Sequence, residues 1–359
     1  MSPSTLEFHP IRVPGSVHGD DAADFRDMVE VRNRVYREIS GHDDNRMTPE
    51  EILPVYRPDD PHERRLLWLV RAAGRPVGRL GIDLPLEAGS RSAYLLIELV
   101  QDAWGRGIGS AAETLLVDVA RREGRSILQT WVEHPAAEGE RLTPPTGYGT
   151  VPHDHAARFL LRHGYTLEQV IRVSAYDLHG PHEHLAVLAE DARAAASGYR
   201  TVQWELPTPD AHVEGYAWMK SRMSTDAPAA GLVVDEEIWD ADRLRAHDAQ
   251  YLDGGRRVLV TAAVHVATGE LCAFNELAIG QDPTEASHQE DTLVLRAHRG
   301  HRLGMLVKAE GLLSWRERWP GSPRVITYNA EENRPMLGIN EALGFVPRAY
   351  EGAWKKVLG

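Results

Sequence analysis

The chain has 359 residues, of which 42% are hydrophobic and 26% are charged, and its formal net charge is −13 at pH 7. The length favours two domains of ordinary size, and the composition is that of a folded protein rather than a disordered or fibrous one. The acidic balance disfavours a general nucleic-acid binder, because neutralisation of phosphates by Lys and Arg supplies most of that affinity.

The sequence contains no recognisable signal for membrane insertion, secretion or metal binding. No run reaches the roughly 18 apolar residues of a membrane span, and the N-terminal segment lacks the pattern of a secretory signal, so a cytoplasmic location is expected. Cys272 is the single cysteine, which excludes an internal disulfide; in the apolar run ELCAF it is expected to be a core residue. The 17 histidines show no convincing ligand spacing, so no metal is expected.

The first half begins with a strand-like segment, FHPIRVPG, and a helical stretch over residues 21–39. A hairpin-like pair of strands follows over 66–84, with AGRP as its turn. An apolar-rich strand over 95–100 then ends in the glycine-rich turn GRGIGS, and apolar residues at helical spacing predict a helix after it. Residues 126–132 predict another strand, and a short helix over 156–165 ends in glycine.

The second half repeats this order. YRTVQWELP, a helical stretch over 210–223 and a hairpin over 257–277 precede a strand end at 293–295. A second glycine-containing turn and helix follow over 296–313, then a strand over 323–328 and a closing helix over 336–345. The repeat predicts two similar domains, 1–180 and 199–359, joined by a linker helix over 181–198.

Both glycine-rich turns are candidate anion-binding sites. A strand that ends in such a turn and opens a helix directs several backbone N–H groups, together with the helix dipole, at one spot. Neither turn has the Gly-Lys-Ser/Thr ending of a nucleotide triphosphatase loop, and the preceding hairpins argue against a dinucleotide-binding fold. Glycine also allows tight helix–strand packing, so a purely structural interpretation stays open for each turn.

The motifs VQDAWGRGIGSAAETLL and LRAHRGHRLGMLVKAEGLL, with the closing segments LRHGY and NEALGF, resemble the GNAT acyltransferase superfamily over nearly the whole chain. The resemblance implies a mixed α/β fold with two tandem GNAT-type domains, each a mostly antiparallel, splayed sheet flanked by helices. It also implies an N-acetyltransferase, which moves an acetyl or related acyl group from acyl-CoA to a primary amine of a small molecule or peptide in a ternary complex.

In this superfamily the turn reads Gln/Arg-x-x-Gly-x-Gly/Ala, its amides hold the pyrophosphate of acetyl-CoA, and a strand amide polarises the thioester carbonyl. The first turn has Trp104 where Gln or Arg is expected, and the second has Arg302 where the first glycine is expected. The cofactor-binding residues that the resemblance implies are Val100, Arg106, Gly107, Ile108, Gly109 and Ser110 in the first half, and Val294, Leu295, Arg299, Gly300, His301, Arg302, Leu303, Gly304 and Asn333 in the second.

Members of the superfamily often carry Asn-x-x-Ala-x-x-x-Tyr before the closing helix, where Asn holds the pantetheine arm and Tyr protonates the departing thiolate. The second half keeps the Asn as Asn333 but has Asn340 in place of Tyr, and the first half has His153 and Leu160 at these positions. The general acid is therefore open, and Asn340 is expected to hydrogen-bond the sulfur. Asn333 is also a suitable helix cap.

Charge around the second turn favours the second half as the catalytic one, with the first half a degenerate or secondary copy. Four cations lie there with no acidic residue between positions 296 and 308, namely Arg296, Arg299, Arg302 and Lys308. A basic rim suits the phosphates of coenzyme A. In the first turn, Asp102 offsets Arg106.

The reaction needs a proton acceptor, because an alkyl ammonium has a pKa near ~10. Glu276, in the hydrophobic strand AFNELAI, is the first candidate, since it could face the splayed cleft with a raised pKa. Asp291 is the second, and Glu98 is the candidate if the first half is active. Each of the three is equally consistent with a solvent-facing strand residue.

Two other functions stay open at this point. Some relatives of this fold transfer aminoacyl groups from charged tRNA, which calls for a broad basic face, and the overall acidity disfavours it. A non-catalytic acyl-CoA sensor would explain why both halves lack the tyrosine. For the leading hypothesis we expect a monomer or homodimer that acts on an amine, without a membrane partner.

Overall fold

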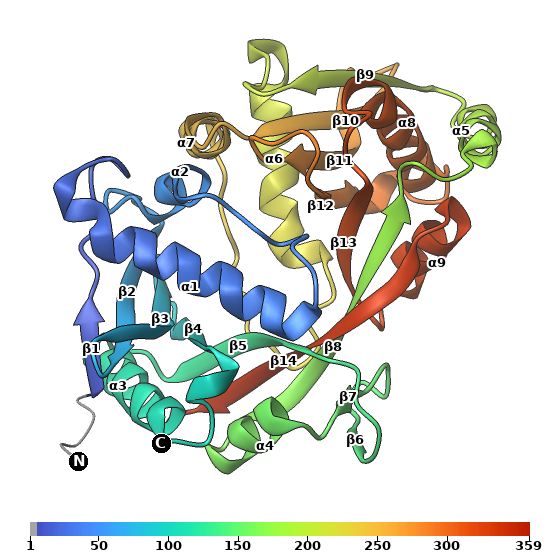
Figure 1. The fold of residues 1–359 in the computed structure, drawn as a ribbon. Coiled ribbons are helices and arrows are strands. Elements are labelled where there is room, and N and C mark those ends of the chain that lie inside the picture. Colours follow the sequence, from blue (N-terminus) through green and yellow to red (C-terminus); the bar gives the residue numbers. More distant parts are fainter. Residues whose placement is uncertain (1–5) are drawn as a thin grey trace. The chain divides into compact units, whose positions relative to one another are not determined.

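The computed structural model describes residues 6–359, which form two compact units (Figure 1). The first unit contains the chain up to Ile171 together with Ala229–Asp235 and Ala349–Gly359, and the second contains Arg172–Pro228 and Glu236–Arg348. Each unit is a mostly antiparallel sheet with helices packed on it, so the predicted mixed α/β fold is confirmed. The domain limits 1–180, 181–198 and 199–359 stay a prediction.

The sheet of the first unit is built from hairpins and one late strand. Its strands are, in spatial order, β1 (Leu6–Pro10), β2 (Glu63–Ala72), β3 (Arg75–Pro85), β4 (Ser92–Leu99), β5 (Ile127–His134), β14 (Val346–Val357) and β8 (Thr166–Asp177). The turn between β2 and β3 uses Ala73 and Gly74, both at positive φ. The unit holds β14 from Ala349 onward and β8 up to Ile171, so the last strand of the chain completes its sheet.

The helical elements of the first unit are α1 (Ala23–Ser40), α2 (Pro49–Ile52), α3 (Ile108–Arg122) and α4 (His155–Arg162), with the 3₁₀ turns η1 (Asp20–Ala22), η2 (Leu53–Tyr56) and η3 (Gln101–Ala103) and the small hairpin β6 (Arg141–Leu142) and β7 (Val151–Pro152).

Helices α1 and α3 cover opposite faces of the first sheet. Arg79 of β3 reaches Met28 of α1, and Arg79 lies opposite Glu98 in the β3–β4 register. Gly109 of α3 instead lies against Leu99, the next residue of β4. Because neighbouring residues of a strand face opposite sides of the sheet, Glu98 belongs to the α1 side and Leu99 to the α3 side.

Strands β4 and β5 are parallel neighbours that separate after a short stretch. Their register pairs only Ser92 with Ile127, Ala93 with Leu128 and Tyr94 with Gln129. Beyond these pairs, residues 95–99 of β4 and 130–133 of β5 line opposite walls of a cavity. The splayed sheet that the sequence predicts is therefore present in this unit.

The second unit repeats the arrangement. Its strands are, in spatial order, β8, β13 (Arg324–Ala330), β12 (Ser287–Val294), β11 (Leu271–Ile279), β10 (Arg257–His265) and β9 (Tyr199–Glu205). Its helical elements are α5 (Glu183–Ala195), α6 (Asp210–Asp226), α7 (Ala241–Asp253), η4 (Arg296–His298), α8 (Leu303–Arg318) and α9 (Arg334–Leu343). Helix α5, which the sequence suggests as a linker, packs on α8 within this unit.

Parallel pairing between β12 and β13 is equally short, with Ser287 opposite Val325 and His288 opposite Ile326. Helix α7 has no counterpart among the elements expected from the sequence. Within residues 6–359, none of the helices combines the length and the apolar character that a bilayer crossing requires.

Strand β14 should carry much of the stability of the first unit, because Trp354 is fully buried in its hydrophobic core. We expect Trp354→Ala to lower the free energy of unfolding by ~3–5 kcal/mol, as for other large-to-small core substitutions. The exposed Val357 on the same strand provides a matched control, since Val357→Ala should change stability by no more than about 0.5 kcal/mol. Urea denaturation followed by circular dichroism measures both; equal stability of the two variants would contradict the insertion of β14.

Candidate functional site

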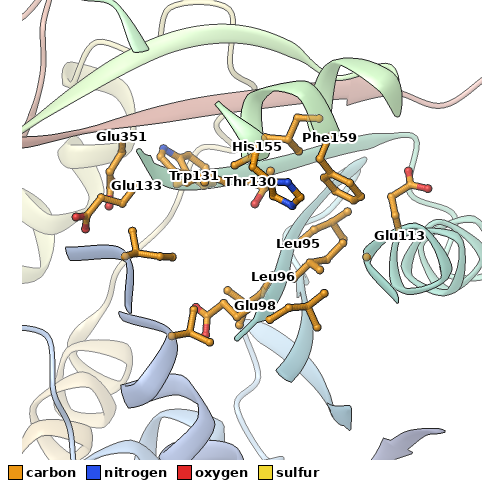
Figure 2. Close-up of a pocket in the computed structure, with 18 of the residues that line it drawn as sticks. Leu95, Leu96, Glu98, Glu113, Thr130, Trp131, Glu133, His155, Phe159 and Glu351 are labelled. Atoms are coloured by element: carbon orange, nitrogen blue, oxygen red, sulfur yellow. The ribbon is translucent and has the colours of Figure 1, made fainter. Parts of the chain in front are cut away.

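A cavity of about 200 Å³ lies where β4 and β5 separate in the first unit (Figure 2). Its lining is mostly apolar, with Leu95, Leu96 and Leu99 from β4 and Phe159 and Leu160 from α4. Its walls come from α1, β4, β5, α3 and α4, and Glu351 of β14 also reaches it. The cavity therefore has an α3–α4 end and an acidic end, which Figure 2 shows with Glu113 on one side and Glu133 and Glu351 on the other.

The first glycine-rich turn lies at the α3 end. Gly105 and Gly107 have φ values of 70° and 80°, which favour glycine, and Gly107 is the N-cap of α3 without any side-chain cap. The N–H groups of the first turn of α3 thus have no intrahelical acceptors and no capping side chain. Gly109 lines the cavity, and a Cβ there would lie 3.2 Å from the Phe159 ring. Glycine in this turn serves both backbone conformation and close packing.

Other predicted residues of the first turn lie around this end. Val100 is buried beneath the turn, Ile108 is buried at the start of α3, and Arg106 is exposed. The Ser110 hydroxyl lies 3.0 Å from His163 Nε2. Trp104, which replaces the expected Gln or Arg, donates its indole N–H to the Leu99 carbonyl at 2.8 Å and stacks on His155.

Glu98 lines the acidic end as one half of an ion pair. The Arg79 guanidinium donates to both Glu98 oxygens at 2.6 and 3.0 Å, and both side chains are largely buried. The phenol of Tyr36, which also lines the cavity, has its pKa raised by the negative charge of Glu98 and by burial. Glu98 is therefore fixed in place, with its charge balanced by Arg79.

Glu133 and Glu351 lie directly opposite each other in the β5–β14 register and both reach the cavity. Neither carboxylate makes an ion pair or side-chain hydrogen bond to any part of the chain that the structure describes. Burial, followed by the charge of Glu133, raises the pKa of Glu351 to about 7. Burial also raises the pKa of Glu133, while the imidazoles of His42 and His134 act in the opposite direction. Glu351 is thus able to bind or release a proton near neutral pH.

At the start of the corresponding splay in the second unit, polar side chains bridge the two strands. Gln289 donates to Thr327 across the gap at 2.9 Å, and Lys308 Nζ donates to Gln289 Oε1. Lys308 stands four residues after Gly304, as Glu113 stands four residues after Gly109, and it is completely buried. Burial lowers the pKa of Lys308 to about 7. Lys308 was predicted as part of an accessible basic rim, and that prediction is wrong.

The two carboxylates favoured by the sequence as bases are already engaged. Lys220 Nζ lies 3.1 Å from both Glu276 oxygens and 2.7 Å from Asp291 Oδ2, and the Tyr216 hydroxyl donates to Glu276. Glu276 and Lys220 are nearly inaccessible, at 3% and 4% exposure. Lys220 holds the pKa of Asp291 below its ordinary value. The structure thus brings Glu276 and Asp291 together, but both carboxylates surround the buried ammonium group of Lys220.

The basic turn at 296–302 has an acidic partner that the local sequence does not contain. Asp226, at the end of α6, lies 3.3 Å from Arg296 and 3.5 Å from Arg299, and its carboxylate is almost fully buried. Arg302 is the N-cap of α8 with φ 56°, the position that Gly107 takes in α3. A non-glycine residue there has the left-handed backbone that usually favours glycine.

The remaining predicted residues of the second half have structural contacts. Asn333 caps α9 by accepting from the Met336 N–H, and Asn340 donates to Asn329 Oδ1 at 2.6 Å. A Cβ at Gly304 would lie 3.0 Å from Ile339. Five more predicted residues lie around the turn. Val294 ends β12 and Leu295 follows it, His301 contacts the Tyr199 ring, Leu303 is buried at the start of α8, and Gly300 has a positive φ.

One mixed group of possible metal ligands occurs in the second unit. The donor atoms of Glu270, Cys272 and His298 all lie within 4.8 Å of one another. The sequence shows no metal-binding motif here, because Glu270 precedes β11 and Cys272 lies within it, whereas His298 lies in the later turn η4. Burial raises the pKa of the Cys272 thiol to about 11, so the thiol is neutral at physiological pH.

Sequence reasoning did not single out Tyr36, Trp131, Glu133 or Glu351 as site residues. Glu133 follows directly after the predicted strand at 126–132, so a strand-end carboxylate was a usable signal. Glu351 gave no such signal, because only the β5–β14 pairing brings it to the cavity.

Residues 26–139 match the model of the acetyltransferase (GNAT) family. The chain is similar to a tandem GNAT protein from the clavulanic acid biosynthesis pathway, solved without AcCoA, with 25% identity over 99% of both chains and a TM-score of 0.76. No curated protein sequence gives a significant match.

Two further solved structures share the fold. A GCN5-related N-acetyltransferase from Sphaerobacter thermophilus has 14% identity over 98% of this chain and 95% of its own, with a TM-score of 0.62. A GCN5-related glucosamine N-acetyltransferase region of a fungal multi-domain GH3 beta-N-acetylglucosaminidase has 14% identity over 99% of this chain and 38% of that one, with a TM-score of 0.59.

Glu351 should destabilise the protein above neutral pH. Its folded-state pKa lies above the ordinary glutamate value of 4.5, so stability falls as the pH rises from about 4.5 to about 7, and the loss is complete above that. We expect Glu351→Gln to raise the free energy of unfolding at pH 8 by an amount on the order of 1–3 kcal/mol, and to have little effect at pH 4.5. Denaturation curves at the two pH values test this. Glu138→Gln, at an exposed glutamate, is the control; a destabilised Glu351→Gln at pH 8 would contradict the expected repulsion.

Proposed function

We propose that this chain, a tandem-domain protein of the GNAT superfamily, is an N-acyltransferase. It would transfer an acetyl or related acyl group from acyl-CoA to a primary amine of a small molecule or peptide, by direct transfer in a ternary complex. The observation that carries the proposal is the cavity between the separated strands β4 and β5, which opens beside the uncapped N-terminus of α3.

We place the reaction in the first unit, although the charge pattern of the sequence favours the second. The first unit has an accessible cavity at the strand separation, with apolar walls and an acidic end. At the matching place in the second unit, Lys308 donates to Gln289, and Gln289 donates to Thr327. Asp226 also pairs with the arginines of the second turn. A structural or non-transferring role suits that unit better.

The residues of the first unit fit acyl-CoA. Gly107 leaves the N-terminus of α3 free of side-chain caps, so the amides of the turn could bind the pyrophosphate. The apolar walls from Leu95 to Leu99 and from α4 suit the pantetheine arm. When bound, the thioester supplies an acyl group activated for attack by an amine.

The acidic end suits the acceptor amine. An amine attacks only when neutral, so the incoming ammonium must first lose a proton. Glu351 is our candidate proton acceptor, because a pKa of about 7 matches the working pH. Glu98, held in place by Arg79, would accept a hydrogen bond from the amine and orient it.

Coenzyme binding distinguishes the two units. A valine at position 109 would contact Phe159 of α4, and a valine at position 304 would contact Ile339 of α9. Because α4 and α9 are equivalent helices, Gly109→Val and Gly304→Val form a matched pair. We expect Gly109→Val to weaken acetyl-CoA binding by at least about tenfold, because the side chain also enters the cavity, and Gly304→Val to have little effect. Isothermal titration calorimetry measures both. If Gly304→Val weakened binding and Gly109→Val did not, the second unit would be the one that binds acetyl-CoA.

The pH dependence of turnover tests the proton acceptor. Because Glu351 must be ionised to accept a proton, kcat/KM should rise with pH and level off above about pH 7. In Glu351→Gln this rise should disappear, and kcat should fall by roughly 10²–10⁴-fold. The measurement is steady-state thiol release with acetyl-CoA and an amine panel, with product masses verified. An unchanged profile in the variant would exclude Glu351 as the acceptor, and coenzyme binding without turnover on any amine would favour a sensor.

A further inference from the structure

The acidic end of the cavity carries more negative charge than its surroundings balance. Of its three carboxylates, Glu98 is matched by the buried guanidinium of Arg79. Glu133 and Glu351 have no ion-pair partner among residues 6–359, although both face the same cavity (Figure 2). Two facing carboxylates in a partly buried site repel each other and require protons or a cation.

Charge balance during acyl transfer decides how many cations the site needs. If Glu351 takes a proton from the ammonium of the acceptor, Glu351 becomes neutral and so does the amine. Glu133 lies directly opposite Glu351 in the β5–β14 register and has no ion-pair partner among residues 6–359. Burial raises the pKa of Glu133, and the imidazoles of His42 and His134 act in the opposite direction. A second positive charge on the acceptor would balance Glu133 throughout the reaction.

We propose, building on the acyltransferase function above, that the acceptor is a short dication: an aliphatic primary amine with a second positive charge a few bonds away. Side chains directly opposite on antiparallel strands have Cβ atoms roughly 5 Å apart. The Glu133 and Glu351 carboxylates therefore match two cationic groups joined by about three or four methylenes. Glu351 receives the reacting ammonium and Glu133 the other one.

The surroundings of the pair suit the methylene chain of such an acceptor. Trp131, two residues before Glu133 on β5, is 41% exposed and lines the cavity. Its ring packs against Tyr94 with a centroid distance of 5.7 Å, which fixes its orientation. Aromatic faces attract both methylene groups and ammonium ions. Val35 and Ile39 of α1 add apolar surface on the lining.

The transfer balances as follows. One ammonium of the dication gives a proton to Glu351, and its nitrogen forms a bond to the acyl carbon while the carbon–sulfur bond breaks. The second proton lost by that nitrogen goes to the departing sulfur, directly or through water. The products are a monoacylated cation, which keeps its charge on Glu133, and the free thiol.

Three acceptors of equal chain length test the proposal: butane-1,4-diamine, butylamine and 4-aminobutanoate, with acetyl-CoA as donor. We expect kcat/KM for the diamine to exceed that for butylamine by at least about tenfold, with 4-aminobutanoate the poorest. Glu133→Gln should lower the diamine-to-butylamine ratio by at least about tenfold. Glu138→Gln removes an equal charge at an exposed position and should leave the ratio unchanged.

Calorimetric binding of the diamine and butylamine to the wild type and to Glu133→Gln gives a second readout that does not need turnover. Equal kcat/KM for the diamine and butylamine would overturn the dication proposal and leave the acyltransferase function standing. Tighter binding of the diamine that is lost in Glu133→Gln, without turnover of any amine, would support the cation site and overturn the acyltransferase function. Equal binding of both amines would overturn the cation site by itself.

Discussion

The separation of two parallel strands is the constraint on which each unit depends. In the first unit, β4 and β5 pair over three residues and then diverge, and in the second unit β12 and β13 pair over two. Beyond that point the backbones no longer bond to each other, and the space must be filled by side chains or left for a ligand. In the second unit, Lys308 donates to Gln289 and Gln289 donates to Thr327 where the strands begin to separate. The first unit keeps a cavity with apolar walls, and our proposal that the reaction occurs there depends on this difference rather than on the shared fold.

Local signals in the sequence predicted most of the architecture. The hairpins, the glycine-rich turns and the closing helices depend on neighbouring residues, so their repetition gave the two-unit fold directly. Glu98 and Gly109 were also identified, because both belong to the strand–turn–helix segment that lines the cavity. What the sequence could not give is pairing between distant segments. Glu351 meets Glu133 only through the β5–β14 register, and no local pattern encodes which strand inserts there.

Charge counted along the chain was a poor guide to charge in space. The second turn has no acidic residue nearby in sequence, yet Asp226 of α6 pairs with both Arg296 and Arg299. Lys308, counted with them, points into the interior and is fully buried. Conversely, Glu276 was expected to face a cleft and instead binds Lys220. Ion pairs between different elements cancel charges that a count along the sequence treats as independent, so such a count overstates the free positive charge of the second turn.

The position of β14 also bears on the order in which the protein can be made. During synthesis the chain up to Ile171 is complete long before residues 349–359 exist, yet those residues form a strand inside its sheet. While the second unit is translated, β5 of the first unit therefore lacks β14, its neighbour on one side. Domains of most chains fold one after another from the N-terminus. Here residues 349–359, which are made after the second unit, complete the first unit, so the time during which that strand edge is open to wrong pairing is set by the translation of the second unit.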